Sequence, residues 1–310
     1  MSYKSILTVL TRAADASLAV GAAARLAQTL DAHLDILVLG VDRTQVGYSY
    51  IGSGAIMMQV SLDRAEAEAR ETEAAVKAEL LKRPPGLRSS VEAAVTQLGA
   101  MNDLVAQRAR FADLVVLPRP YGEGKGAESE AVIEAAMFEG KASVLVLPEK
   151  GLGEHVVPKR IVVAWNQSAE AMTATRMALP FLKSADAVDI TVIDPPPHGA
   201  ERSDPGGLLC QMLVRHGVHA EVSVLARSLP RVSDVLARHI WDQNADLLVM
   251  GAYGHSRFRE AILGGATRNM LEQAETPVFL AHRPDILRRA AQTGTPLRFS
   301  PPPPPKGAPP

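Results

Sequence analysis

Near the end of the chain the sequence reads Asp246-Leu-Leu-Val-Met-Gly-Ala-Tyr-Gly-His-Ser-Arg-Phe-Arg-Glu-Ala-Ile-Leu-Gly-Gly-Ala-Thr-Arg-Asn-Met270. An apolar run led by an aspartate opens this segment, a pattern typical of a strand buried on both faces of a helix-covered parallel sheet. Gly251 and Gly254 follow the run. Because they lack a Cβ, we expect them to reach positive φ, turn tightly and approach a ligand closely.

A second group of small residues, Gly264, Gly265, Ala266 and Thr267, comes directly before a helical pattern that includes Met270. The N-terminus of a helix carries unpaired N–H groups and a partial positive charge. We therefore expect this group of small residues to be able to hold a phosphate.

The glycines fit neither the dinucleotide-binding fingerprint nor a Walker loop. Their spacing resembles the G-x2-G-x9-G motif of the universal stress protein family, in which a strand-loop-helix junction cradles the phosphates and ribose of ATP. The flanking runs Leu247–Gly251 and Thr276–Leu280 resemble the family as well. One residue departs from the pattern: the family often has Ser or Thr directly after the third glycine, where this chain has Gly265. Thr267 is the nearest hydroxyl.

The two halves of the chain repeat the same order of segments, which indicates a duplicated domain. Four pairs of segments correspond: Ser5–Leu10 with Arg160–Trp165, Asp35–Leu39 with Asp189–Ile193, Asp103–Leu117 with Asp234–Met250, and Ala142–Leu147 with Thr276–Ala281.

Helical patterns separate these segments, so the sequence predicts an α/β protein with right-handed crossovers and parallel sheets. The predicted helices are Ala14–Leu30, Leu62–Leu81, Ala169–Leu182, Gly207–His216 and Val232–Trp241. The resemblance implies two tandem doubly wound domains of the adenine nucleotide alpha-hydrolase-like type. We expect strands Ser143–Leu147 and Pro277–Ala281 to meet antiparallel between them, because this contact removes two exposed edges.

The predicted division of the chain gives a first domain at residues 1–149, a linker at 150–158, a second domain at 159–284 and a disordered proline-rich tail at 285–310. The linker prediction comes from the short, charged, glycine-bearing stretch Pro148–Pro158. The tail prediction comes from its prolines, which cannot propagate a helix or a ladder.

The resemblance also implies site residues in the second domain. Asn166 stands where the family usually has an acidic residue that meets the nucleotide, and its amide can still hydrogen-bond a ribose or a base edge. Ala164 and Val192 match positions that line the adenine and ribose. The loop positions are matched by Met250, Gly251, Gly254, Gly264, Gly265, Ala266 and Thr267.

The first domain lacks this pattern. Thr11 occupies its acidic position, and Pro118 stands where Gly251 stands in the second domain. A proline fixes φ and removes an N–H group. We therefore expect the first domain not to bind nucleotide through the family motif and to have a structural role or to offer a different surface.

A loop is predicted from Val41 to Gln59, where Tyr48, Tyr50, Ile51 and the run Ile56–Met58 stand among glycines and serines. Two interpretations remain. If these side chains are exposed, they form an adhesive patch for a partner or a lid. If they pack over a helix of the same domain, which we favour, they belong to the core.

The composition of the chain limits the classes of partner and the cellular location that we expect. A net charge of -1 gives no electrostatic reason to expect nucleic acid or an anionic membrane as a partner. No apolar run is long enough to span a bilayer, and the N-terminus has no signal-peptide pattern. The single cysteine, Cys210, suits a reducing cytoplasm and is more typical of a small apolar filler than of a reactive thiol.

The resemblance implies a regulatory protein of the stress response that binds ATP, with or without Mg²⁺, in its second domain, and the single cysteine favours a cytoplasmic location. We expect a homo-oligomer or an internal pseudo-dimer of the two domains. The alternative is a nucleotide-free scaffold or chaperone-like dimer, and a third hypothesis is a nucleotidyl transferase or hydrolase. The sequence shows no nucleophile-base set and no metal-ligand spacing, so we predict no catalytic residue and at most slow ATP hydrolysis.

Overall fold

The computed structural model of the protein describes residues 2–44, 54–122, 125–195, 203–252 and 265–282. The first half contains β1 (Ser5–Leu10), α1 (Ala16–Leu30), β2 (His33–Asp42), α2 (Gly54–Leu80), β3 (Ser89–Gln97), α3 (Leu98–Ala109), β4 (Leu114–Pro118), α4 (Ala127–Glu134) and β5 (Val144–Leu147). The second half contains β6 (Arg160–Ala164), α5 (Ala169–Met177), α6 (Leu179–Leu182), β7 (Ala187–Ile193), α7 (Gly207–Arg215), β8 (Ala220–Leu225), α8 (Val232–Asp242), β9 (Leu247–Gly251), α9 (Gly265–Gln273) and β10 (Val278–Ala281). Strands and helices alternate, as predicted for an α/β protein.

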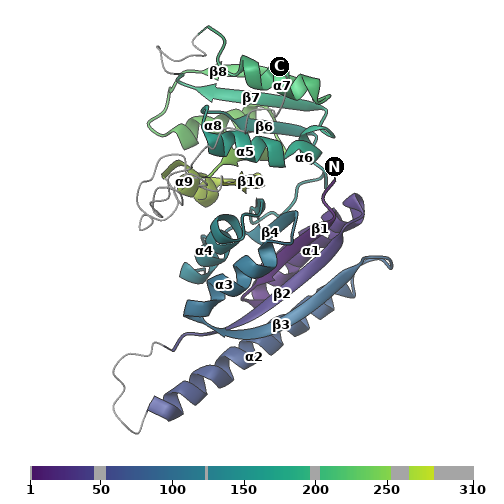
Figure 1. The fold of residues 1–310 in the computed structure, drawn as a ribbon, viewed down its shortest axis with the longest axis vertical. Coiled ribbons are helices and arrows are strands. Elements are labelled where there is room, and N and C mark those ends of the chain that lie inside the picture. The colour runs from purple at the N-terminus through teal and green to yellow at the C-terminus, as the bar shows by residue number, and fades with distance from the viewer. Residues whose placement is uncertain (1, 45–53, 123–124, 196–202, 253–264, 283–310) are drawn as a thin grey trace, which may run out of the picture.

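The described strands form one sheet in the order β3-β2-β1-β4-β5-β10-β9-β6-β7-β8 (Figure 1). Neighbouring strands are parallel within each half. The two halves meet where β5 and β10 pair antiparallel, with Phe279 opposite Leu145. The predicted antiparallel contact is therefore confirmed, and the fold is a doubly wound α/β fold.

Helices cover both faces of this sheet. One core packs side chains of α1, α5, α6 and α7 against the sheet, and the other packs those of α3, α4, α8 and α9. The central strands supply both cores by alternation: Leu145 and Phe279 belong to the first core, whereas Val144 and Val278 belong to the second. Burial on both faces explains why these strands consist of uninterrupted apolar residues.

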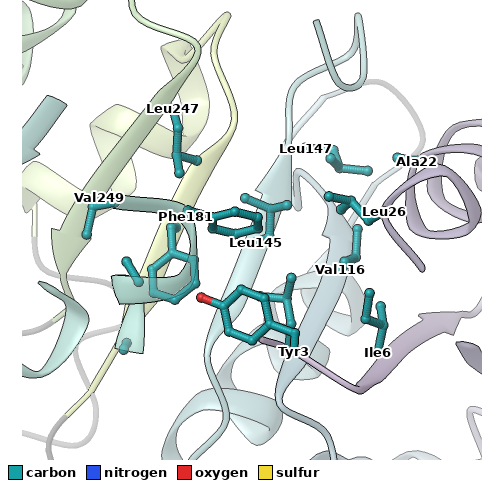
Figure 2. Packing of buried hydrophobic residues seen from close by; sticks show 14 of the residues in the cluster. Tyr3, Ile6, Ala22, Leu26, Val116, Leu145, Leu147, Phe181, Leu247 and Val249 are labelled. Carbon is teal, nitrogen blue, oxygen red and sulfur yellow. The ribbon is translucent and has the colours of Figure 1, made fainter. Parts of the chain in front are cut away.

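Aromatic side chains close the first core across the junction of the two halves (Figure 2). The ring centroids of Tyr3 and Phe181 are 5.0 Å apart, and those of Phe181 and Phe279 are 6.3 Å apart. The Tyr3 hydroxyl donates a 2.7 Å hydrogen bond to the Met177 carbonyl oxygen, so the N-terminal strand region is tied directly to α5. The two halves therefore share packing as well as a strand pair.

The stretch predicted as a linker crosses this same region. Leu152, Val156 and Val157 are partly buried and pack against the first core. Lys150 forms a 2.7 Å ion pair with Glu275, an exposed pair that contributes little to stability. The connection is thus fastened to the body of the protein by apolar contacts.

Two edge strands, β3 and β8, were not predicted from the sequence. Their residues alternate between exposed and partly buried, and they lack the continuous apolar run of the central strands. Each lies at an end of the sheet and pairs with one neighbour only. An edge strand with two wet faces has no strong sequence pattern, which is why the helical and central segments were found and these were not.

The helix α2 differs most from its prediction, because it begins at Gly54 instead of Leu62. Ile56, Met57 and Met58 are 70%, 69% and 48% exposed, so the favoured interpretation that this region packs into the core is wrong for these side chains. A helix of 27 residues is about 40 Å long, longer than the sheet edge it covers, and Figure 1 shows its first turns extending past the strands. Tyr48, Tyr50 and Ile51 lie outside the described residues.

No helix in the described ranges is long and apolar enough to cross a membrane.

The helix predicted over Ala169–Leu182 is divided into α5 and α6. Pro180 lies in the first turn of α6, where its missing N–H group costs nothing because first-turn donors have no intrahelical partner. Inside a continuous helix the same proline would remove a hydrogen bond. The break is therefore explained by this single residue.

We predict that Phe279→Ala lowers the free energy of unfolding by about 3–5 kcal/mol, because it leaves a cavity where the two halves meet. Phe279 is 0% exposed, and Phe111, at 81% exposed, provides the control. Urea denaturation of both variants checks this. A small, equal effect of Phe279→Ala and Phe111→Ala would show that the junction contributes little to stability.

Candidate functional site

The carboxyl ends of β6, β7 and β9 bring three of the predicted site residues to one edge of the sheet. Ala164 pairs in register with Thr191 on one side and with Met250 on the other, and Val192 follows Thr191. Ala164 is partly exposed, whereas Val192 and Met250 are buried. The side chains of Val192 and Met250 belong to different cores, so they do not meet. Any contact of these two residues with a ligand at this edge must use their backbone groups.

Asn166 lies on the turn that connects β6 to α5. Its Oδ1 accepts a 3.1 Å hydrogen bond from the backbone N–H of Ser168, while the Ser168 hydroxyl accepts one of 3.0 Å from Ala171 and caps the helix. Gln167 adopts a φ of 62° between them. A carboxylate at position 166 would accept the same bond, so the amide keeps the turn while removing the negative charge. Asn166 is exposed, with its amide nitrogen available as a donor.

Gly251 is required by packing and not by a tight turn. A Cβ added to it would lie 2.4 Å from the backbone nitrogen of Ala171 and 2.6 Å from the carbonyl carbon of Glu170. Gly251 is absent from the described glycines with positive φ, so the prediction that it turns tightly at positive φ is wrong. The glycine instead lets the first turn of α5 rest directly on the end of β9.

The small-residue group opens α9 instead of preceding it. Gly265 is the first residue of this helix, Gly265 and Ala266 are exposed, and Thr267 is buried at 4% exposure. No acidic residue lies in the first turn of α9. The turn therefore presents backbone N–H groups and no opposing charge, whereas the Thr267 hydroxyl is not at the surface. Gly254 and Gly264 lie outside the described residues.

The first half contributes residues that hold α9, and the sequence did not reveal them. Arg119, directly after β4, donates a 3.3 Å hydrogen bond from Nη1 to the carbonyl oxygen of Glu272 in the last turn of α9. The Arg268 guanidinium lies 5.3 Å from the centre of the Tyr121 ring. A cation at a helix C-terminus complements the helix dipole. Both contacts join positions 147 or more residues apart, for which no local pattern exists.

The corresponding edge of the first half differs in its chemistry. Pro118 pairs with Leu147 as Gly251 pairs with Ala281, which supports the predicted correspondence of Pro118 and Gly251. Lys125 lies over this edge: its Nζ donates a 2.7 Å bond to the Arg119 carbonyl oxygen and is 3.5 Å from Asp15. Burial lowers the pKa of Lys125, and the Asp15 carboxylate opposes that shift.

The helix that corresponds to α9 in the first half is α4, and its first turn carries Glu128 and Glu130. Glu128 is held by Arg43, with Nε and Oε1 2.5 Å apart. The first turn of α4 thus carries negative side chains, which the helix dipole favours there, while the first turn of α9 has none. The two halves thus share a topology and differ in the charge at the end of the sheet.

Other reactive side chains have structural roles. The Cys210 thiol donates to the carbonyl oxygen of Ala220 at 3.3 Å, and burial together with nearby Asp204 raises its pKa, which opposes thiolate chemistry. His239 is buried against Asp189, 3.2 Å from its carboxylate, and is a packing residue. Among the described residues, no group of three or more His, Cys, Asp or Glu side chains is arranged to hold a metal ion.

The sheet order and the helices on both faces define a doubly wound α/β protein. A model of the universal stress protein family matches residues 158–282. The second half of the chain is therefore similar to a universal stress protein domain.

Similar proteins agree with this assignment. A universal stress protein from Synechocystis is 34% identical over 69 residues, which is 22% of this chain and 23% of that protein. A universal stress protein from Archaeoglobus fulgidus has the same fold, with a TM-score of 0.60, 16% identity, and coverage of 91% of this chain and 97% of its own. A functionally unknown protein from Pseudomonas aeruginosa has a TM-score of 0.57 and 13% identity, with coverage of 94% of this chain and 96% of its own. The fold likeness therefore extends over both halves.

We predict that Gly251→Ala destabilises the protein by about 1–3 kcal/mol, because the added methyl group meets the backbone of α5. Gly265→Ala is the matched control: no described atom lies within 4 Å of its added Cβ, and alanine favours helix. Denaturant midpoints of the two variants check the prediction. Equal losses at both positions would contradict the packing role assigned to Gly251.

Proposed function

We propose that the protein is a regulatory protein of the stress response that binds ATP, with or without Mg²⁺, at the edge formed by β6, β9 and α9. The first half is a diverged second copy that does not bind the nucleotide. The two copies form an internal pseudo-dimer, and the chain acts in the cytoplasm. The family to which residues 158–282 belong supports the stress-response part of this proposal.

The observation that carries the proposal is the contrast between α9 and α4. The exposed first turn of α9 offers N–H groups without a competing carboxylate, whereas that of α4 contains two glutamates. A triphosphate is strongly anionic, so it is stabilised at the first of these helix ends and repelled at the second.

The residues present fit an adenine nucleotide. Ala164 is partly exposed at the end of β6, the exposed amide of Asn166 can donate to a ribose hydroxyl, and the exposed first turn of α9 offers N–H groups that would bind phosphates. A bound Mg²⁺ would take its ligands mainly from phosphate oxygens and water. These groups bind and position, and the amide of Asn166 cannot accept a proton as a general base. The proposed activity is therefore binding, with turnover slow at most.

The test compares ATP and AMP in thermal unfolding of the wild type and of Ala266→Glu. ATP at about 100 times its dissociation constant should stabilise the wild type by roughly 2.7 kcal/mol. Ala266→Glu gives α9 the charge that α4 already has, so we expect the helix to remain folded and ATP stabilisation to be lost. The matched control is Ala74→Glu, which adds the same charge at an exposed position of α2.

Retained ATP stabilisation in Ala266→Glu would show that α9 does not hold the phosphates. Absence of ATP stabilisation in the wild type would remove the proposal and favour a nucleotide-free role. Rapid release of ADP or AMP during the measurement would instead favour an enzyme.

A second candidate function, a scaffold or chaperone-like role, is favoured by the exposed apolar residues at the start of α2. We predict that Ile56→Glu combined with Val60→Glu abolishes any suppression of aggregation that the wild type shows toward a heat-denatured client protein. Val214→Glu, which places a charge on another exposed valine, should leave it unchanged. If the double variant suppresses aggregation as well as the wild type, the start of α2 is not the contact surface.

A further inference from the structure

A groove of about 300 Å³ lies at the amino ends of β1, β2 and β3, on the face of the sheet that carries α3. It is at the opposite end of these strands from Pro118 and Lys125, so it is separate from the edge that corresponds to the proposed nucleotide site. Its size is at the lower end of the range for small-molecule sites. Its walls are formed by Ser5, Leu7, Asp35, Ser90, Arg108 and Phe111, among others.

The polar groups of this groove leave one negative charge without a strong partner. Arg108 bonds Glu92 and balances its charge. Asp35 accepts a hydrogen bond from the Ser90 hydroxyl, and no Lys or Arg of the described ranges lies within ion-pairing distance of it. The nearest group that can carry a positive charge is the half-exposed His33, 3.5 Å away.

In the second half the carboxylate at the corresponding strand position is buried and takes its partners from within the chain. Asp189 occupies the place of Asp35, since Val162 pairs with Asp189 as Leu7 pairs with Asp35. Thr191 and Ser223 donate hydroxyl bonds to Asp189, and α8 brings the His239 ring nitrogen to 3.2 Å. Asp189 is consequently 6% exposed, whereas the Asp35 side chain is 46% exposed.

Apolar side chains line the groove around Asp35 in the first half. The buried side chains of Leu7 and Leu37 form the floor, and Phe111, 81% exposed, stands at the rim. An aromatic ring beside a half-exposed carboxylate, whose partners in the chain are the Ser90 hydroxyl and the His33 imidazole, suits a ligand that is flat and apolar at one end and cationic at the other. In the second half the His239 imidazole comes from α8 and lies 3.2 Å from Asp189, whereas in the first half the His33 imidazole comes from the same strand as Asp35 and lies 3.5 Å from it.

We propose that this groove binds a small organic cation, an aromatic or heterocyclic amine. Its ammonium or ring N–H group donates to Asp35 and the Ser90 hydroxyl, and its ring packs over Leu7 and Leu37 against Phe111. Asp35 supplies the charge that selects the ligand, and Phe111 supplies most of the apolar contact.

The experiment uses benzylamine as the probe and benzyl alcohol as its neutral counterpart, titrated into the full-length protein and followed by amide NMR shifts. We expect benzylamine to shift the amides of Ser5, Ser90 and Phe111 and benzyl alcohol to bind at least about tenfold more weakly. Asp35→Asn should lower benzylamine affinity by about tenfold or more. Phe111→Ala should lower it several-fold.

The matched control is Glu221→Gln, which removes an exposed carboxylate at the edge strand of the other half and should leave affinity unchanged. Ser90→Lys, which places an amine opposite Asp35 in the strand register, should abolish binding and does not depend on how Asp35→Asn folds. Equal binding of benzyl alcohol, unaltered affinity in Asp35→Asn and Ser90→Lys, or no shifts near the groove would each overturn the proposal.

Discussion

The antiparallel pairing of β5 with β10 is the contact on which the rest of this structure depends. Each half on its own would end in a short apolar strand with unpaired N–H and C=O groups, a template for aggregation. Pairing Val144–Val146 with Val278–Leu280 removes both edges and joins two sheets into one. The buried Phe279 and Phe181 then extend a single core across the join. The two halves are in this way bound by backbone hydrogen bonds and by shared apolar burial.

The direction of that pairing also determines where sites can lie. Strands within each half are parallel, so reversing direction at the junction sends the carboxyl ends of the two halves to opposite edges of the common sheet. The end of β4 therefore lies near the last turn of α9, where Arg119 meets the Glu272 carbonyl oxygen. Residues of the first half thus support the helix whose other end faces the proposed nucleotide site. Under the proposed function, the copy that does not bind nucleotide would position the copy that does.

Much of the fold was predictable because buried parallel strands are continuous apolar runs, and β1 was predicted with its exact bounds, Ser5–Leu10. The edge strands β3 and β8 were not predicted because both of their faces are partly exposed to solvent. The predicted helix was shorter than α2 because the first residues of α2 carry no charge and include glycine. At the candidate site, the spacing of the glycines pointed to the edge of the sheet at the end of β9, where the proposed nucleotide site lies. It did not reveal why Gly251 is a glycine, because the atoms that exclude a Cβ belong to α5, some eighty residues earlier. The contact of Arg119 with α9 and the open position of Asp35 likewise arise only when distant segments are brought together.

The central claim is that one half of the molecule binds ATP and the other does not. Isothermal titration of ATP into the wild-type protein tests it most directly, because the stoichiometry counts sites without reference to any variant. The account predicts one ATP per chain. Two ATP molecules per chain would show that the edge beside Lys125 binds as well, and none would remove the nucleotide from the function of this protein.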